Sequence, residues 1–192
     1  EFVFESSENK KFKNLVTTSR LVHKNGIDLV IRALPLLPAD IIFNIYGLGE
    51  EEGKLKKLAE NLGVAARVNF KGFVNSSQLA VLLREKESAS IFIRPSRSEG
   101  LGNSFLEAMA IGLPVVAPLV GGIKDFLIDK ETGFVIEAES PASIASVIGY
   151  IMDQDNALEV ERVRQNARRL VEERFAWPAI AEKMRAVFTG GY

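Results

Sequence analysis

The segment over residues 96–110, SRSEGLGNSFLEAMA, carries the residue types best suited to chemistry in this chain. It follows an apolar run, contains two glycines, and begins a helix at Asn103 or Ser104, both of which are residue types that cap helix N-termini well. The free N–H groups and the partial positive charge at a helix start suit a phosphate group. We therefore expect a phosphate-bearing ligand at this loop.

Two glutamates in this segment have different predicted tasks. Asn103 and Glu107 are four residues apart and so lie on one face of the helix. A carboxylate one turn from a phosphate would repel it, so Glu107 fits better as an acceptor for sugar hydroxyls, as in dinucleotide sites. Glu99, in the preceding loop, suits a second hydroxyl-bearing group. The alternative interpretation is an ordinary helix whose dipole favours acidic residues near its start.

These residues must be positioned by strands and helices, which are expected to alternate along the first 140 residues. The apolar runs show no polar/apolar alternation, which is typical of parallel strands buried on both faces. The expected strands are Leu15–Ser19, Ile41–Tyr46, Arg67–Phe70, Ala89–Ile93, Val115–Ala117 and Gly133–Ile136. The expected helices are 27–34, Glu50–Leu62, Ser76–Glu85, Asn103–Ile111, Ile123–Ile128, Pro141–Met152, Asn156–Phe175 and Pro178–Phe188. This pattern predicts an α/β fold, a doubly wound, Rossmann-like parallel sheet of about six strands with C-terminal helices from about residue 141.

Composition excludes several classes of protein. The chain has 192 residues, 24 Lys+Arg against 25 Asp+Glu, one histidine and no cysteine. The near-zero charge argues against a nucleic-acid binder, and the missing cysteines remove disulfides, thiolate metal sites and cysteine nucleophiles. A single His23 makes a histidine metal site or a Ser-His-Asp triad hard to build. The longest apolar stretch, 108–123, is interrupted by glycines and prolines and cannot span a membrane.

The spacing of Glu99 and Glu107 in EGLGNSFLEAMAIGLPVVA resembles the signature of retaining nucleotide-sugar glycosyltransferases of the family-4 kind. Further support comes from SRLV at 19–22, GLG at 47–49, FKGFV at 70–74, GG at 121–122 and ETGF at 131–134. The resemblance runs from about Leu15 to the C-terminus. It implies that residues 1–192 form a single donor-binding domain, the C-terminal half of a two-domain GT-B fold, and that the N-terminal, acceptor-binding domain is absent.

The resemblance also implies roles for individual residues. Glu107 would bind the ribose hydroxyls of the donor nucleotide, and Glu99 would contact the donor sugar. Backbone N–H groups facing the sugar and diphosphate would come from Leu101, Gly102, Asn103 and Ser104. Glycine at positions 100 and 102 would let the ligand approach the backbone closely, because a Cβ there would block it.

Arg20 lies at the carboxyl end of the first expected strand, the edge where such a sheet binds its ligand. By resemblance, Arg20 and a nearby lysine neutralise the donor diphosphate and stabilise it as it leaves. The family usually places this lysine five residues after the arginine, where this chain has Asn25, whereas Lys24 lies one residue earlier. In a helix that offset is about 100° of rotation. We expect Lys24 to take the role, the alternative being a solvated surface lysine.

Two glycine-containing turns complete the predicted site. Gly47-Leu48-Gly49 is a poor dinucleotide fingerprint and is equally well explained as a strand-to-helix turn, but the resemblance places Gly47 and Gly49 near the phosphates. The resemblance also places Phe73 and Val74 where the family holds the nucleobase. A position in the core is the alternative for Phe73.

These features predict the donor-binding domain of a retaining glycosyltransferase, which moves a sugar from a nucleoside-diphosphate sugar to an acceptor hydroxyl. We expect no essential metal or other cofactor, and we interpret Asp153-Gln154-Asp155 as a solvated turn. We expect a cytoplasmic protein that meets a membrane, if at all, only through the missing half. We also expect this chain alone to bind nucleotide without transferring sugar. The alternatives are a nucleotide-sugar epimerase of similar fold and a non-catalytic nucleotide-sugar-binding module.

Overall fold

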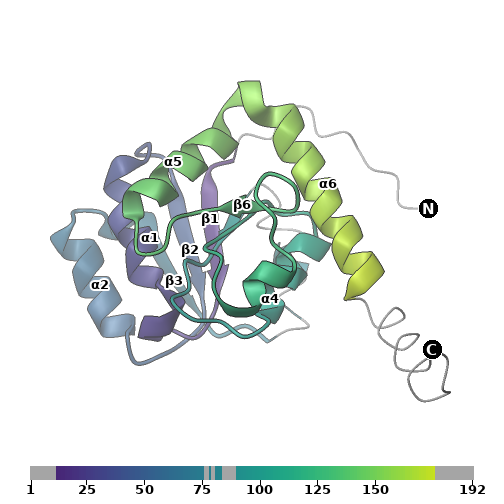
Figure 1. Cartoon of the computed structure of the whole chain (residues 1–192). Helices are drawn as coiled ribbons and strands as arrows, with labels where there is room; N and C mark the ends of the chain where they lie inside the picture. The colour runs from purple at the N-terminus through teal and green to yellow at the C-terminus, as the bar shows by residue number, and fades with distance from the viewer. Residues whose placement is uncertain (1–11, 76–77, 79–80, 84–89, 176–192) are drawn as a thin grey trace, which may run out of the picture.

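The computed structural model describes residues 12–75, 78, 81–83 and 90–175, and within them a parallel sheet lies between two layers of helices (Figure 1). The strands are β1 (Asn14–Thr18), β2 (Ile42–Tyr46), β3 (Val68–Gly72), β4 (Ser90–Ile93), β5 (Val115–Ala117) and β6 (Phe134–Val135). The α-helices that lie wholly within the described residues are α1 (Ile27–Ala33), α2 (Glu52–Asn61), α4 (Asn103–Ala110), α5 (Pro141–Met152) and α6 (Ala157–Arg174).

Burial on both faces explains the continuous apolar strands. Successive side chains of a strand point to opposite faces, so both must be apolar when helices cover both faces. In β4, Ile91 and Ile93 pack into the core beneath α1, α2 and α5, whereas Phe92 packs into the core beneath α4 and α6. β1 divides in the same way, with Leu15 on the first side and Val16 on the second. The two hydrophobic cores therefore share the sheet as their common wall.

The order of strands across the sheet is β3-β2-β1-β4-β5-β6. The chain builds outward from β1 to β3, then returns to the centre to place β4 on the other side of β1. In such sheets the loops after the two central strands diverge, and ligands bind in the resulting crevice at the carboxyl ends. The reversal thus points to the segments after β1 and β4, residues 19–26 and 94–103.

The predicted fold class is confirmed, and the strand positions agree with the predictions to within about two residues. The expected helix over Ile123–Ile128 is wrong in type and place, because a 3₁₀ turn over Gly121–Asp125 (η4) stands there. Of the expected helix Ser76–Glu85, residue 78 and residues 81–83 are helical and the others lie outside the described residues. The expected helix Pro178–Phe188 also lies outside them.

Arg67 ties the start of β3 to the connection between α1 and β2 at the amino edge of the sheet, opposite the candidate site. Its guanidinium donates to the main-chain oxygens of Ile41 (3.0 Å), Leu34 (2.8 Å) and Pro38 (2.7 Å). These carbonyls belong to the connection between α1 and β2, where those of Leu34 and Pro38 also accept from the N–H groups of Leu37 and Ile41. The planar fork of an arginine can reach all three at once, whereas the single ammonium of a lysine cannot.

We expect Arg67→Lys to lower the free energy of unfolding by about 1–3 kcal/mol, because one ammonium cannot replace the three hydrogen bonds that the guanidinium donates. Equilibrium urea unfolding with an unchanged m-value would measure the loss. Arg32→Lys is the matched control, since Arg32 is exposed and its ion pair with Asp28 spans 3.9 Å. The control should lie within about 0.5 kcal/mol of the unmodified chain. Equal stability of the two variants would contradict the assignment.

Candidate functional site

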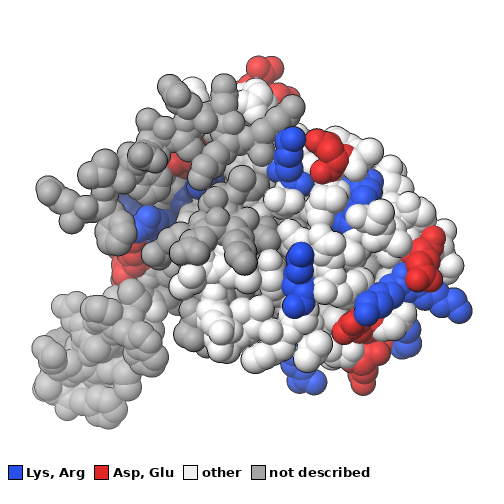
Figure 2. Space-filling model, turned by 180° about the vertical axis from the view of Figure 1, so that it is seen from behind, with Lys and Arg blue, Asp and Glu red and all other residues white. Residues whose placement is uncertain are grey.

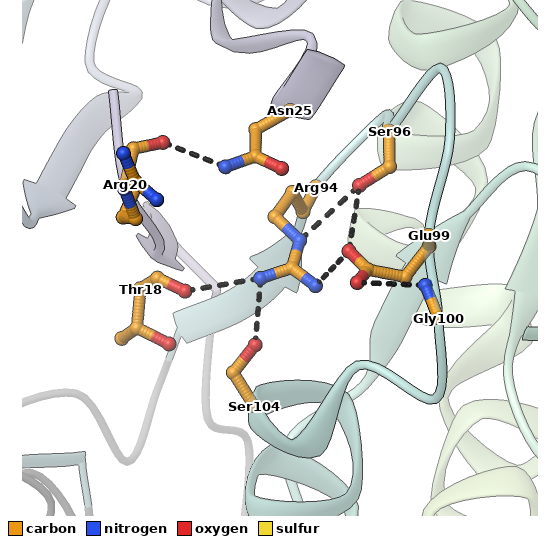
Figure 3. A network of polar contacts seen from close by, with 8 residues as sticks. All are labelled: Thr18, Arg20, Asn25, Arg94, Ser96, Glu99, Gly100 and Ser104. Atoms are coloured by element: carbon orange, nitrogen blue, oxygen red, sulfur yellow. Dashed lines mark hydrogen bonds and ion pairs between the residues drawn. The ribbon is translucent and has the colours of Figure 1, made fainter. Parts of the chain in front are cut away.

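Arg94 is the centre of a polar network at the carboxyl ends of β1 and β4 (Figure 3). Its Nη1 donates to the main-chain oxygen of Thr18 (3.3 Å) and to the hydroxyl of Ser104 (2.9 Å). Its Nε donates to the hydroxyl of Ser96 (3.2 Å), and its Nη2 forms an ion pair with Oε2 of Glu99 (2.5 Å). One side chain therefore connects the end of β1, the loop after β4 and the first turn of α4.

An aromatic ring supports the flat side of this guanidinium. The Cζ atom of Arg94 lies 4.3 Å from the ring centroid of Phe105, which is fully buried and in edge contact with Phe92. Only 6% of Arg94 is exposed, and this burial lowers its pKa, an effect that the charge of Glu99 opposes. Arginine nevertheless remains charged in proteins, so the site contains a fixed buried cation.

Sequence reasoning missed Arg94. It stands before Pro95 and directly after the expected strand Ala89–Ile93. The available signal was a cation at the last position of a buried parallel strand, five residues before Glu99. Such a side chain must enter the crevice at the sheet edge or remain buried without a partner, and the second is costly.

Glu99 is held in place by this network. Its side chain is 12% exposed; Oε2 contacts Arg94 and accepts from Ser96 at 3.4 Å, while Oε1 accepts from the N–H of Gly100 at 3.2 Å. The backbone beneath it is fixed by Gly121, whose φ is +51° and whose added Cβ would lie 1.9 Å from the carbonyl oxygen of Glu99. Gly122 donates its N–H to the carbonyl of Gly100 (3.1 Å). The GG pair of the sequence signature therefore packs under the loop that carries Glu99.

The start of α4 differs in one respect from the prediction. Neither Asn103 nor Ser104 caps the helix with its side chain: Gly102 is the N-cap, with φ +70°, and no side-chain cap hydrogen bond is present. A Cβ at Gly102 would lie 2.6 Å from the ring of Phe105, whereas one at Gly100 would meet no atom within 4 Å. Packing thus explains the glycine at 102 but not the one at 100. Leu101 is 43% exposed beside them.

Glu107 lies on α4 one turn beyond Asn103 and is exposed. Partial desolvation of its carboxyl group raises the pKa of Glu107, and no compensating cation contributes. Among the residues that the structure describes, its carboxylate has no hydrogen-bond or ion-pair partner. The two glutamates of the signature therefore differ: Glu99 is paired and held, and Glu107 is free to accept hydrogen bonds.

Arg20 and Lys24 both follow β1 and both are exposed. Asn25, which stands where the resemblance expects a lysine, is 5% exposed, and its Nδ2 donates to the main-chain oxygen of Arg20 (2.7 Å). The 3₁₀ turn His23–Asn25 (η1) sends Lys24 outward while Asn25 points inward. The structure thus places Lys24 on the loop beside Arg20 but shows no direct contact between their side chains.

Arg97 links the loop after β1 to the loop after β4. Its N–H donates to the main-chain oxygen of Lys24 (2.7 Å), and its guanidinium donates to that of His23 (2.7 Å) and to both carboxylate oxygens of Asp28 (2.8 and 3.0 Å). Burial opposes the charged form of Asp28, but Arg97 outweighs it and keeps the pKa of Asp28 below its usual value. His23 is exposed, and its main-chain carbonyl accepts the hydrogen bond from Arg97.

Gly47 and Gly49 have a packing role that is visible without a ligand. A Cβ at Gly47 would lie 1.8 Å from the carbonyl oxygen of Ser19, and one at Gly49 would lie 2.2 Å from that of Leu21. The loop after β2 therefore packs directly against the loop after β1, and Leu21 donates its N–H to the carbonyl of Leu48 (3.0 Å). This supports the interpretation as a close-packed turn and leaves the predicted proximity to phosphate as a proposal.

The alternative that Phe73 lies in the core is wrong, since Phe73 is 73% exposed after the end of β3. Val74 is half-buried and packs against the core beneath α4 and α6. A large exposed ring at the carboxyl edge of the sheet is available to a planar ligand.

The described residues hold no group of three or more His, Asp or Glu side chains that could bind a metal. Asp153 is used as a cap, because its Oδ1 accepts from the N–H of Asp155 (3.1 Å). No helix in the described part of the chain is long and apolar enough to cross a membrane. On the face seen in Figure 2, acidic and basic side chains of the described residues lie beside one another rather than in a field of one sign.

Known proteins resemble this chain in sequence and structure. It is 32% identical over 180 residues to an uncharacterized glycosyltransferase of Methanocaldococcus jannaschii, a match covering 92% of this chain and 44% of that protein. It is 31% identical over 187 residues to a GDP-mannose-dependent alpha-(1-6)-phosphatidylinositol monomannoside mannosyltransferase of Mycobacterium tuberculosis, covering 92% and 47%.

The structure is similar to that of Anabaena HepE in complex with UDP and glucose, with a TM-score of 0.82, 23% identity, and coverage of 94% of this chain and 49% of that one. This likeness confirms the expected fold. The chain spans about half the length of each of these three proteins. Over residues 1–170 it matches the profile of the glycosyl transferases group 1. The chain therefore belongs to the glycosyl transferases group 1 family.

Proposed function

We propose that this chain is the donor-binding half of a retaining glycosyltransferase that takes a sugar from a nucleoside-diphosphate sugar and passes it to an acceptor hydroxyl. The observation that carries the proposal is the pair of glutamates at the reversal of strand order. Glu99 is fixed just before the start of α4, and Glu107, on α4, presents a carboxylate that has no partner among the described residues. Two acceptors so spaced suit two sugar rings joined through a diphosphate.

The cations and the helix start supply the charge that a diphosphate requires. Arg20 and Lys24 follow β1, and the N–H groups of the first turn of α4 follow β4, the neighbouring strand in the sheet. Fixed positive charge stabilises the negative charge that grows on a departing phosphate. We propose that these groups suffice without a metal, so that EDTA leaves donor binding unchanged.

The remaining residues form the proposed walls of the donor site. Glu107 binds the ribose hydroxyls, and Glu99 contacts the donor sugar. The exposed ring of Phe73, with Val74, lies beside the base, while Gly47 and Gly49 border the phosphates. Relatives support this class of ligand, because one is named as GDP-mannose-dependent and HepE is seen with UDP and glucose.

The acceptor site belongs, in this proposal, to a further domain. The relatives are about twice as long as the matched region, and they match this chain over nearly all of its length. We therefore infer that the chain binds its donor alone and that transfer requires the other half of the enzyme. Any meeting with a membrane would then be made by that other half.

The proposal is tested by a binding screen of the chain against UDP-glucose, GDP-mannose and ADP-glucose. We expect one of the three to raise the midpoint of thermal unfolding and to bind with 1:1 stoichiometry in calorimetry, since a ligand that binds only the folded state stabilises it. We expect no sugar transfer and no conversion of the donor by the chain alone. Conversion of a nucleotide sugar without an acceptor would identify an epimerase, and absence of binding to all three would contradict the proposal.

Glu107→Gln tests the ribose contact. We expect it to weaken nucleoside-diphosphate binding about 10- to 100-fold, because hydrogen bonds to an ionised acceptor are among the strong ones. Binding by the unmodified chain should also weaken as the pH falls through the pKa of Glu107, which is raised above its usual value, because protonation removes the acceptor. The Gln variant should lose this pH dependence. Glu172→Gln, on the outer part of α6, is the control and should change neither quantity.

A further inference from the structure

We propose that Arg94 is a positioning residue that holds the Glu99 carboxylate in the orientation in which it receives the donor sugar. The proposal rests on the proposed function, since it assigns Glu99 to the sugar. Neither the sequence signature nor the resemblance pointed to Arg94. It acts through Glu99 and need not touch the ligand itself.

The first argument is that stability alone does not explain this ion pair. Arg94 is 6% exposed and the Glu99 side chain is 12% exposed, so both charges have left most of their water. Removing a cation and an anion from water offsets much of their mutual attraction, and well-packed apolar residues often replace such pairs without loss of stability. The pair is therefore better explained by what it orients.

The second argument is that contacts from three parts of the fold, the end of β1, the loop after β4 and α4, fix the guanidinium. Nη1 is bound to Thr18 at the end of β1 and to Ser104 in the first turn of α4, and Nε is bound to Ser96. The ring of Phe105 covers one face at 4.3 Å. Nη2 carries two N–H groups, and one of them donates to Oε2 of Glu99. A planar fork with fixed contacts transfers its orientation to the carboxylate that it binds.

The third argument concerns the second oxygen of the carboxylate. Oε2 is engaged by Arg94, while Oε1 accepts one hydrogen bond from the N–H of Gly100 at 3.2 Å. A carboxylate oxygen has a further lone pair, so Oε1 can accept from a sugar hydroxyl as well. Figure 3 shows Arg94 and Gly100 contacting the Glu99 carboxylate from different directions. Rotation of this carboxylate would break both contacts.

The experiment compares the affinity of the chain for a nucleoside diphosphate with its affinity for the corresponding sugar nucleotide. The probes are UDP with UDP-glucose and GDP with GDP-mannose. The dissociation constant of the bare diphosphate divided by that of its sugar nucleotide gives a ratio that reports the sugar contact, and the ratio falls when the sugar contact is lost. In Arg94→Lys the buried charge remains but the fork is lost. We expect this ratio to fall about tenfold while affinity for the bare diphosphate stays within about twofold. Arg67→Lys is the matched control and should leave the ratio unchanged, because its carbonyl partners lie at the opposite edge of the sheet.

A double-mutant cycle shows whether Arg94 acts through Glu99. Glu99→Gln should lower the ratio, and adding Arg94→Lys to it should lower the ratio no further. Should Arg94→Lys fail to fold, Ser104→Ala replaces it, since it removes one contact to Nη1 and keeps both charges. That variant should lower the ratio by a smaller factor.

The outcomes separate the two proposals. If the unmodified chain binds none of the four probes, the proposed function fails, and the role of Arg94 fails with it. If the chain binds donor with a measurable sugar contribution but folded Arg94→Lys and Ser104→Ala keep it, the proposed function stands and the role of Arg94 is overturned. An equal loss of affinity for the diphosphate and the sugar nucleotide, or additive effects in the cycle, would likewise overturn it, because either result indicates a general structural role.

Discussion

The ion pair of Arg94 and Glu99 is the interaction on which the arrangement of the site depends. Alternation of strands and helices brings the ends of β1 and β4 to one edge of the sheet, but it does not fix the loops that follow them. Arg94 supplies that constraint, because its hydrogen bonds reach the end of β1, the loop after β4 and the first turn of α4. Gly121 supplies a second constraint from below, since only a residue without a Cβ can lie so close to the carbonyl of Glu99.

The same pair resolves an electrostatic conflict. A free carboxylate beside the start of α4 would repel a diphosphate, and at close range in a protein this repulsion amounts to several kcal/mol. Because Arg94 neutralises Glu99 locally, the field at the helix start is left to the backbone N–H groups and to the cations after β1. Glu107, which has no such partner, lies a turn further along α4 and has a raised pKa. The two acidic residues thus differ in their charged partners as well as in position.

Much of the fold and part of the site could be predicted from the sequence. The six strands follow from apolar runs that only a doubly covered parallel sheet accommodates, and their ends agree closely with the structure. Where a helix over 123–128 was expected, the chain forms a 3₁₀ turn over Gly121–Asp125, and Gly121 and Gly122 pack against the loop of Glu99, a long-range contact that local patterns do not encode. Arg94 was missed for a related reason: its partners at Thr18, Glu99 and Ser104 come together only in the folded sheet. The functional roles of the individual site residues remain predictions.

Asn25 stands where the resemblance expects the phosphate-binding lysine, so its position in the structure bears on whether Lys24 takes that role. Its side chain is enclosed by the chain and donates to the carbonyl of Arg20, so it fixes the backbone from which Arg20 extends. A lysine in this conformation would bury an ammonium where the structure provides a carbonyl of the chain, at a cost that a neutral amide avoids. Lys24 is exposed, and its main-chain oxygen is bound to Arg97. Asn25 therefore stabilises the backbone of the loop, and Lys24 is the exposed cation of this turn.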